Sequence, residues 1–286
     1  MPMIVDMRLR PPLASLLETP LFKSGSQSST SHPDFPKAPS AQAQSPELLL
    51  REMDQAGIGL GVVMGRQSPG GLGSVPNGEL EEWISRYPDR FVAWVGIDST
   101  QPIEQILAEL KHFIARPGFK GVSIEPSIAP GFTGADDPRL YPLYDECQRI
   151  GAPISITLSA ILQASEHRPI ENGTPTQIYR VAQDFPRLAI HVAHAAWPWV
   201  LEMIAVCFTC RNVWLSPDQY LVPQLPGSEQ YAKAAVNYFP DRTLFGTAYP
   251  FKPFAEMVSA YRSWNWPQAC EQQILGENAL RLMQMK

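Results

Sequence analysis

The sequence predicts an α/β fold, a (β/α)₈ TIM barrel built by one domain that spans residues 1–286. Short apolar segments alternate eight times with helical segments, and the apolar segments are continuous, as in parallel strands covered by helices. A chain of 286 residues has an ordinary length for one such barrel. An open doubly wound sheet is the competing fold, but no G-x-G-x-x-G motif follows the first apolar segment.

The expected strands are short apolar runs, the first of which lies within residues 3–12. The other seven cover residues 60–64, 91–96, 119–124, 153–158, 188–193, 213–215 and 243–246. Helices are expected between them, over residues 46–56, 77–86, 101–115, 137–150, from 174 onward, 198–208 and 227–238, with two more towards the C-terminus.

Local signals support these boundaries. Ser45 and Pro46 occupy the N-cap and first positions that start a helix, and Gly57 suits its end. The segment from about 23 to 44 is rich in Ser, Pro, Ala and Gln, and a loop of this length is usually functional or disordered. We expect it to cap the barrel mouth or to form a subunit contact.

Composition narrows the class of protein. The net charge of −5, without a basic block, argues against nucleic acid as a partner. No apolar run is long enough to cross a membrane, and the N-terminus lacks the apolar region of a secretory signal. The four cysteines suggest reduced thiols and a cytoplasmic location. Cys207 and Cys210 lie in an apolar helical pattern and are expected to pack in the core.

Cationic side chains follow the first two expected strands. Arg8 and Arg10 are two residues apart, so an extended chain places them on the same side. They are either separate ion-paired arginines or a site for an anionic substrate group, since guanidinium forks match carboxylates. Arg66 follows the neighbouring strand and shares both possibilities.

Other chemically active residues follow later strands, where barrel active sites lie. His194 is a candidate proton carrier, and Glu125 is either an arginine partner or a general acid or base. Asp218 and Tyr249 either complete the pocket wall or pin loops. His191 lies three residues before His194, and packing is its expected role.

Three segments resemble the amidohydrolase-2 branch of the amidohydrolase superfamily. In sequence letters they are HVAHAAWPW (191–199), LFGTAYP (244–250) and ILGENALRL (274–282). The Glu125-Pro126 pair and the run LYPLY (140–144) also fit that branch, and the resemblance covers nearly the whole chain. It implies a TIM barrel and an activity among metal-dependent hydrolases, decarboxylases of aromatic and unsaturated acids, hydratases and lactonases.

The metal-ligand positions of that branch are altered here. Arg8 and Arg10 stand where the family has an H-x-H pair, Thr157 where it often has a histidine, and Ala248 where it has an aspartate. Two guanidiniums would repel a divalent ion, so no metal cofactor is expected at the usual place. The alternative is one divalent metal such as zinc on a relocated set of ligands, namely Glu125, His194 and Asp218.

The expected function is an enzyme that acts on a small anionic substrate. Arg8 and Arg10 would bind its carboxylate, and His194 would move a proton with Glu125 or Asp218 as partner. Hydrolysis of a lactone or similar ester is the main expectation, and decarboxylation or hydration of an unsaturated acid is an alternative. A non-catalytic small-anion binding protein, or a partner subunit of an active paralogue, is the other alternative. A homo-oligomer, possibly a dimer, is expected.

Overall fold

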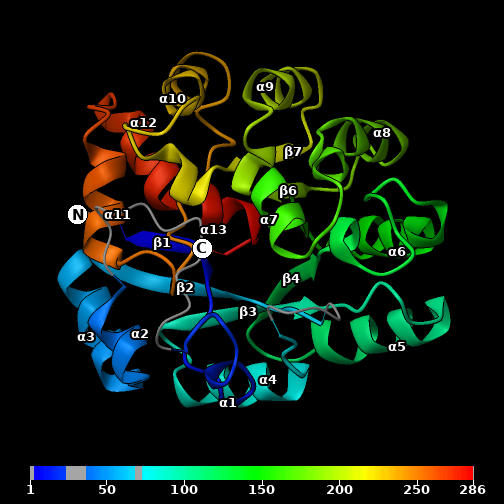
Figure 1. The fold of residues 1–286 in the computed structure, drawn as a ribbon, viewed down its shortest axis with the longest axis horizontal. Helices are drawn as coiled ribbons and strands as arrows, with labels where there is room; N and C mark the ends of the chain where they lie inside the picture. Colours follow the sequence, from blue (N-terminus) through cyan, green and yellow to red (C-terminus); the bar gives the residue numbers. More distant parts are fainter. Residues whose placement is uncertain (1–2, 24–36, 68–72, 286) are drawn as a thin grey trace.

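The computed structural model describes residues 3–23, 37–67 and 73–285, and it contains seven parallel strands in sequential order (Figure 1). The strands are β1 (Ile4–Leu9), β2 (Ile58–Met64), β3 (Phe91–Gly96), β4 (Phe119–Ile124), β5 (Ile154–Thr157), β6 (Ile190–Ala193) and β7 (Val213–Ser216). They curl together inside a ring of helices, which confirms the predicted TIM barrel.

The eighth expected strand differs from the prediction. Residues 243–249 lie between β7 and β1 and form only isolated bridges to them, Leu215 with Thr243 and Leu9 with Tyr249. The gap is nevertheless closed by hydrogen bonds, because the Met7 amide donates to the Phe245 carbonyl at 3.0 Å. Ala248 has a positive φ of 58°, which interrupts the regular ladder at the end of this segment.

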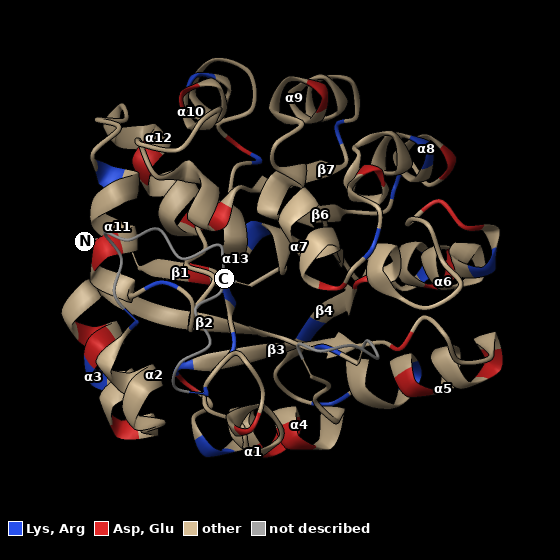
Figure 2. Ribbon diagram, viewed as in Figure 1, with Lys and Arg blue, Asp and Glu red and all other residues tan. Residues whose placement is uncertain are grey.

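The helices that follow each strand form the outer ring (Figure 1). Those of the ring are α3 (Pro46–Ala56), α4 (Asn77–Arg86), α5 (Ile103–Ile114), α6 (Tyr141–Ile150), α8 (Thr176–Asp184), α9 (Val200–Thr209), α10 (Ser228–Asn237) and α11 (Phe254–Arg262). Basic and acidic residues are mixed along α5, α6 and α8 on this outer surface (Figure 2).

Shorter helices lie in the connections. They are α1 (Ala14–Leu17), α2 (Pro39–Ala43), α7 (Ala160–Ser165), α12 (Gln268–Gln272) and α13 (Asn278–Leu282), together with the single turns η1 (Pro126–Ile128), η2 (Pro138–Leu140), η3 (Ile170–Gly173), η4 (His194–Ala196), η5 (Asp218–Leu221) and η6 (Gln273–Glu277). Among the described residues, no helix is long and apolar enough to span a membrane.

Helix α3 begins and ends as its sequence predicts. The Ser45 side chain accepts a hydrogen bond from the Leu48 amide at 3.2 Å, and Gly57 ends the helix with a φ of 75°. Helix α2 was not predicted, because the sequence indicated a loop over residues 23–44, which contain it. Residues 24–36 of that loop lie outside the described part of the chain. All four cysteines are buried and unpaired, and Cys207 and Cys210 pack in the core as expected.

Candidate active site

Three arginines converge on one carboxylate at the carboxyl ends of the strands. Oε1 of Glu125 lies 2.7 Å from Nη2 of Arg66, 3.3 Å from Nη2 of Arg10 and 4.0 Å from Nη2 of Arg8. Each of the four side chains is at most 6% exposed. We call these four residues the arginine cluster. The sequence predicted every member, and the structure brings all of them together.

The arginine cluster favours negative charge. Burial raises the pKa of Glu125, but the guanidiniums of Arg66, Arg10 and Arg8 outweigh it and bring the pKa to about 2. Burial, with Arg66 and Arg8 adding to it, lowers the pKa of Arg10 well below its usual value. Nε of Arg10, Nε of Arg66 and Oε2 of Glu125 are buried without a hydrogen-bond partner among the described residues. The cluster therefore has donor capacity that Glu125 does not use.

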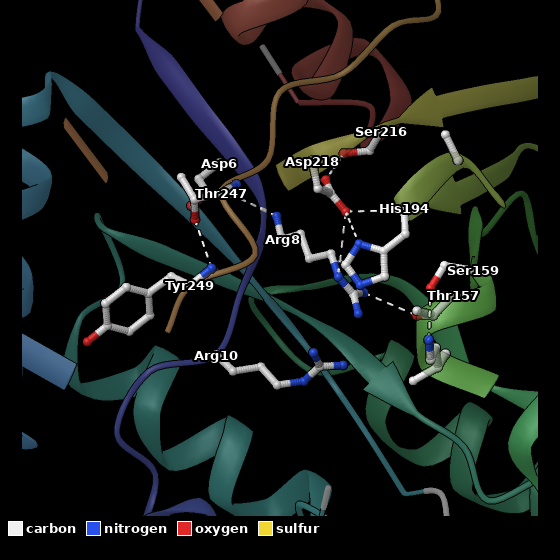
Figure 3. Close-up of polar contacts among 12 residues, drawn as sticks. Asp6, Arg8, Arg10, Thr157, Ser159, His194, Ser216, Asp218, Thr247 and Tyr249 are labelled. Carbon is white, nitrogen blue, oxygen red and sulfur yellow. Dashed lines mark hydrogen bonds and ion pairs between the residues drawn. The ribbon is translucent and has the colours of Figure 1, made fainter. Parts of the chain in front are cut away.

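His194 and Asp218 form a second unit beside the cluster, which we call the His194–Asp218 pair (Figure 3). Nδ1 of His194 lies 3.1 Å from Oδ2 of Asp218, and the His194 amide donates to the same oxygen at 3.1 Å. Ser216 donates its hydroxyl to the other oxygen of Asp218. Arg8 links the two units, because its Nε lies 3.6 Å from Oδ2 of Asp218.

The pair is set up as a neutral imidazole beside an ionised carboxylate. Burial and, to a lesser extent, Arg8 lower the pKa of His194, Asp218 opposes both, and the resulting pKa is about 4. Burial raises the pKa of Asp218, but the His194 contacts, Arg8 and Ser216 bring it below its usual value. A proton would enter this pair more readily if another anion neutralised Arg8.

The backbone is strained around the site. Among the described residues, five non-glycine residues with positive φ lie just after β6 and β7 or within residues 243–249, which we call the eighth segment: His194 (66°), Ala195 (45°), Ala196 (56°), Asp218 (52°) and Ala248 (58°). Such conformations are costly and cluster at functional sites. Here they turn the chain so that His194 and Asp218 face each other across neighbouring strands.

Asp6 has a structural position beside the site. Its carboxylate accepts hydrogen bonds from the Thr247 hydroxyl at 2.6 Å and from the amides of Thr247 and Arg8 at 3.0 Å. These bonds tie β1 to the eighth segment and hold the backbone that carries Arg8. Burial raises the pKa of Asp6 to about 7.

The residues at this site do not suit a divalent metal. Guanidiniums of Arg8 and Arg10 occupy the space where the family resemblance implies imidazoles, and Arg8 donates to Oγ1 of Thr157 at 3.1 Å. No group of three or more His, Cys, Asp or Glu side chains in the described residues could hold a metal ion. The relocated set of Glu125, His194 and Asp218 therefore does not form a ligand cluster. That the protein binds no metal stays a prediction.

Tyr249 and His191 are two further residues for which the sequence predicts a role. The Tyr249 hydroxyl points away from Arg8 in Figure 3 and lies 2.9 Å from the Ser40 hydroxyl, so its ring holds α2. The backbone carbonyl of Tyr249 accepts from the Arg10 amide at 3.0 Å, so its backbone rather than its hydroxyl reaches the site. His191 is buried against the edge of Trp94, as its packing role predicts.

Some residues of the site carried no decisive sequence signal. Tyr220 lies edge-on to His194, with ring centroids 5.5 Å apart, and stacks on Trp197 at 5.0 Å. Gly246 leaves room for Asp218, because a Cβ there would collide with Oδ1. The Ser216-Pro217-Asp218 sequence after β7 indicates a turn, but the hydroxyl contact depends on the positive φ of Asp218.

Comparisons with known proteins agree with this architecture. A sequence model of the family described as amidohydrolase matches residues 38–284. The crystal structure of an uncharacterised TIM-barrel protein from Bordetella bronchiseptica is 36% identical, with a TM-score of 0.86 and 98% of each chain covered. That of 5-carboxyvanillate decarboxylase from Sphingomonas paucimobilis is 17% identical, with a TM-score of 0.71 and 100% of each chain covered, and shares the fold.

A curated relative also has a described activity. It is 2-amino-3-carboxymuconate-6-semialdehyde decarboxylase from Dictyostelium discoideum, 25% identical over 236 residues. The match covers 72% of this chain and 65% of that relative, which is less than two thirds of the relative's length.

Proposed function

The chain belongs to the amidohydrolase family, and from that premise we propose that it is a decarboxylase of a small unsaturated or aromatic carboxylic acid. The observation that carries the proposal is the arginine cluster, whose guanidiniums keep unused donors next to the His194–Asp218 pair. Similarity to two proteins named as decarboxylases supports this reaction class over the others that the family contains. The main expectation from the sequence, lactone hydrolysis, becomes the second candidate.

Substrate binding falls to Arg8 and Arg10. The guanidiniums of both lie below His194 in the view of Figure 3, and both contact Oε1 of Glu125. A buried guanidinium gains a charge-assisted hydrogen bond from a carboxylate or from an oxygen on which negative charge develops. Burial and the neighbouring arginines lower the pKa of both side chains, which means that their positive charge is unfavourable there. An incoming anion would offset that charge.

His194 is the proposed proton carrier. Burial and Arg8 keep its imidazole neutral at pH 7. Asp218, whose Oδ2 lies 3.1 Å from Nδ1 of His194, stabilises the imidazolium that forms when negative charge develops on the bound substrate. His194 would then take from solvent the proton that the reaction consumes.

The bond changes balance without a further reactant. The bond between the substrate carbon and its carboxylate breaks, and CO₂ leaves. The electron pair remains on the substrate, where conjugation carries it towards an oxygen near the arginines. His194 gives its Nε2 proton to the carbon, a C–H bond forms, and solvent restores the proton to His194 in the next cycle.

Lactone hydrolysis is favoured by one feature, the His194–Asp218 pair itself. A neutral imidazole oriented by a carboxylate can accept a proton from water, and Arg8 could stabilise the oxyanion. Hydration of an unsaturated acid would use the same groups. If the protein binds carboxylates without turning them over, the anion-binding alternative is the one that stands.

A panel of unsaturated and aromatic carboxylic acids, incubated with purified protein, tests the proposal by measurement of released CO₂ and of the decarboxylated product. We expect turnover of at least one acid and its loss in His194→Asn. His112→Asn is the matched control, because His112 is exposed on α5. A new carboxylic acid formed from lactones, without CO₂ from any acid, would replace the proposal with hydrolysis.

A further inference from the structure

The buried charges around the proposed substrate site do not cancel. The arginine cluster and the His194–Asp218 pair together hold three guanidiniums and two carboxylates, so one unit of positive charge remains. Every one of these charged side chains is at most 6% exposed. Water therefore screens the excess charge poorly, and a ligand must balance it.

Glu125 sets the size of this excess. Its Oε1 accepts contacts from all three arginines, whereas its Oε2 has no hydrogen-bond partner among the described residues. A carboxylate with an unpaired oxygen inside a cationic site repels a second anionic group placed near it. Glu125 is therefore both a partner of the arginines and a barrier to a second negative charge.

We propose that Glu125 makes this site selective for substrates with one negative charge over substrates of the same skeleton with two. The inference rests on the proposed function for the assumption that the ligand is a carboxylic acid. A monoanion brings the buried charge to zero, and a dianion leaves one uncompensated negative charge. Replacing Glu125 by a neutral residue of the same shape raises the excess to two positive charges and so fits a dianion.

Two probes of the same skeleton isolate charge. Monomethyl fumarate carries one carboxylate and fumarate carries two, on the same unsaturated four-carbon acid. At about pH 6, Asp6 is mostly protonated because its pKa is about 7, and His194 is neutral because its pKa is about 4. The charge count above then applies to the protein used in the titration.

Calorimetric titration of the purified chain is the test. We expect the unsubstituted chain to bind monomethyl fumarate at least tenfold more tightly than fumarate. In Glu125→Gln the ratio should move at least tenfold towards fumarate. Arg66→Gln combined with Glu125→Gln restores one positive charge and should restore the original preference. Glu229→Gln is the control, because Glu229 is an exposed residue on α10 paired with Lys233.

Each outcome decides the inference. Arg66→Gln alone should weaken the binding of both probes, and that of fumarate more than that of monomethyl fumarate. If Glu125→Gln does not fold, this variant and the double variant still test the inference. An unchanged ratio across these variants, or fumarate preferred by the unsubstituted chain, overturns the charge selection. Failure of all variants to bind either probe removes the anion site and the inference with it. A charge-dependent ratio without CO₂ release from any acid would retain this inference and reject the decarboxylase.

Discussion

Arg8 is the residue on which both halves of the site depend. It contacts Thr157, Glu125 and Asp218, which follow or end three different strands. Replacement of Arg8 or Arg10 by Met should weaken carboxylate binding by about 2 kcal/mol, the loss typical of a charged hydrogen-bond partner. Titration with benzoate checks this, with Arg211→Met, an exposed arginine, as control. Unchanged affinity in both variants would make the two arginines purely structural.

Gly246 should be intolerant of a side chain. In Gly246→Ala the new Cβ would collide with Oδ1 of Asp218 and press on Ser216. We expect a loss of about 1–3 kcal/mol in the free energy of unfolding, as for overpacked cores, and weaker anion binding. Gly78→Ala is the control for urea denaturation, because a Cβ at Gly78 meets nothing within 4 Å. Equal stability of the two variants would contradict the tight packing around Asp218.

The metal content of the purified protein follows from the same residues. At an effective dielectric of ~20, a unit positive charge about 5 Å from a divalent ion costs on the order of 6 kcal/mol. Arg8 and Arg10 impose that cost twice, so elemental analysis after dialysis should find no stoichiometric metal. About one zinc, manganese or iron per chain, lost in His194→Asn, would reverse this expectation.

Sequence predicted the residues of the site better than their surroundings. Arg8 lies one residue before the end of β1, and Glu125, His194 and Asp218 follow β4, β6 and β7. The barrel brings such ends together. The contacts that hold them depend on turns with positive φ at alanine and aspartate, for which residue type gives little signal. Tyr220 carried no decisive sequence signal for the same reason.

Helix α2 shows how an element within an apparent loop acquires a position. The Ser40 amide donates to Glu52 of α3 at 2.8 Å, and its hydroxyl contacts both Glu52 and the Tyr249 hydroxyl. Tyr249 in turn stacks on Phe254 of α11 at 4.7 Å. The Ser/Pro/Ala composition conceals this helix, since its fixed position comes from residues far away in the chain. Its place beside Tyr249 accords with the expected cap, which stays a prediction.

The link between Ser40 and Tyr249 can be measured directly. Ser40→Ala and Tyr249→Phe should each lower the free energy of unfolding by about 1 kcal/mol, the usual value of a net hydrogen bond. The double variant should lose about 0.5–1 kcal/mol less than the sum, because both changes remove the same bond. Strict additivity in urea denaturation would show that the two hydroxyls contribute independently.

At the scale of the whole molecule, buried ionisable groups predict a pH dependence of stability. Burial lowers the pKa of His191 to about 3 and that of His194 to about 4, from 6.5. As the pH falls, the two histidines therefore take up protons in the unfolded chain before they do so in the folded protein. Stability accordingly falls as the pH drops below about 6.5. Asp6 acts in the opposite direction, because its raised pKa makes stability fall as the pH rises from about 4 to 7.

Between about pH 5 and 6, each of the two histidines takes up about one proton on unfolding, whereas Asp6 releases one. The net uptake is therefore about one proton. The free energy of unfolding should therefore rise with pH across this interval. In His191→Asn the free energy of unfolding should become nearly independent of pH across this interval. At about pH 5.5, the loss of stability caused by acid should be about 1.4 kcal/mol smaller in this variant than in the unsubstituted chain. Urea denaturation at several pH values checks this, and an unchanged slope would mean that His191 is protonated in the folded protein.

Other properties of the whole molecule remain predictions from the sequence. A cytoplasmic location, expected from the cysteines, and a homo-oligomer both stay predictions. Sedimentation of the purified chain tests the second.

The bond between Asp6 and Thr247 has a consequence for synthesis. The two residues are 241 positions apart, yet their side chains close the barrel between its first strand and its last segment. Closing so long a loop is slow, and most of the chain must be made before it can happen. On the ribosome, β1 leaves the exit tunnel before the other strands, and Thr247 emerges only after the 241 positions that separate it from Asp6 have been translated. Until then one edge of β1 is unpaired and can associate with other chains. A chaperone that covers this edge should therefore raise the yield of folded protein.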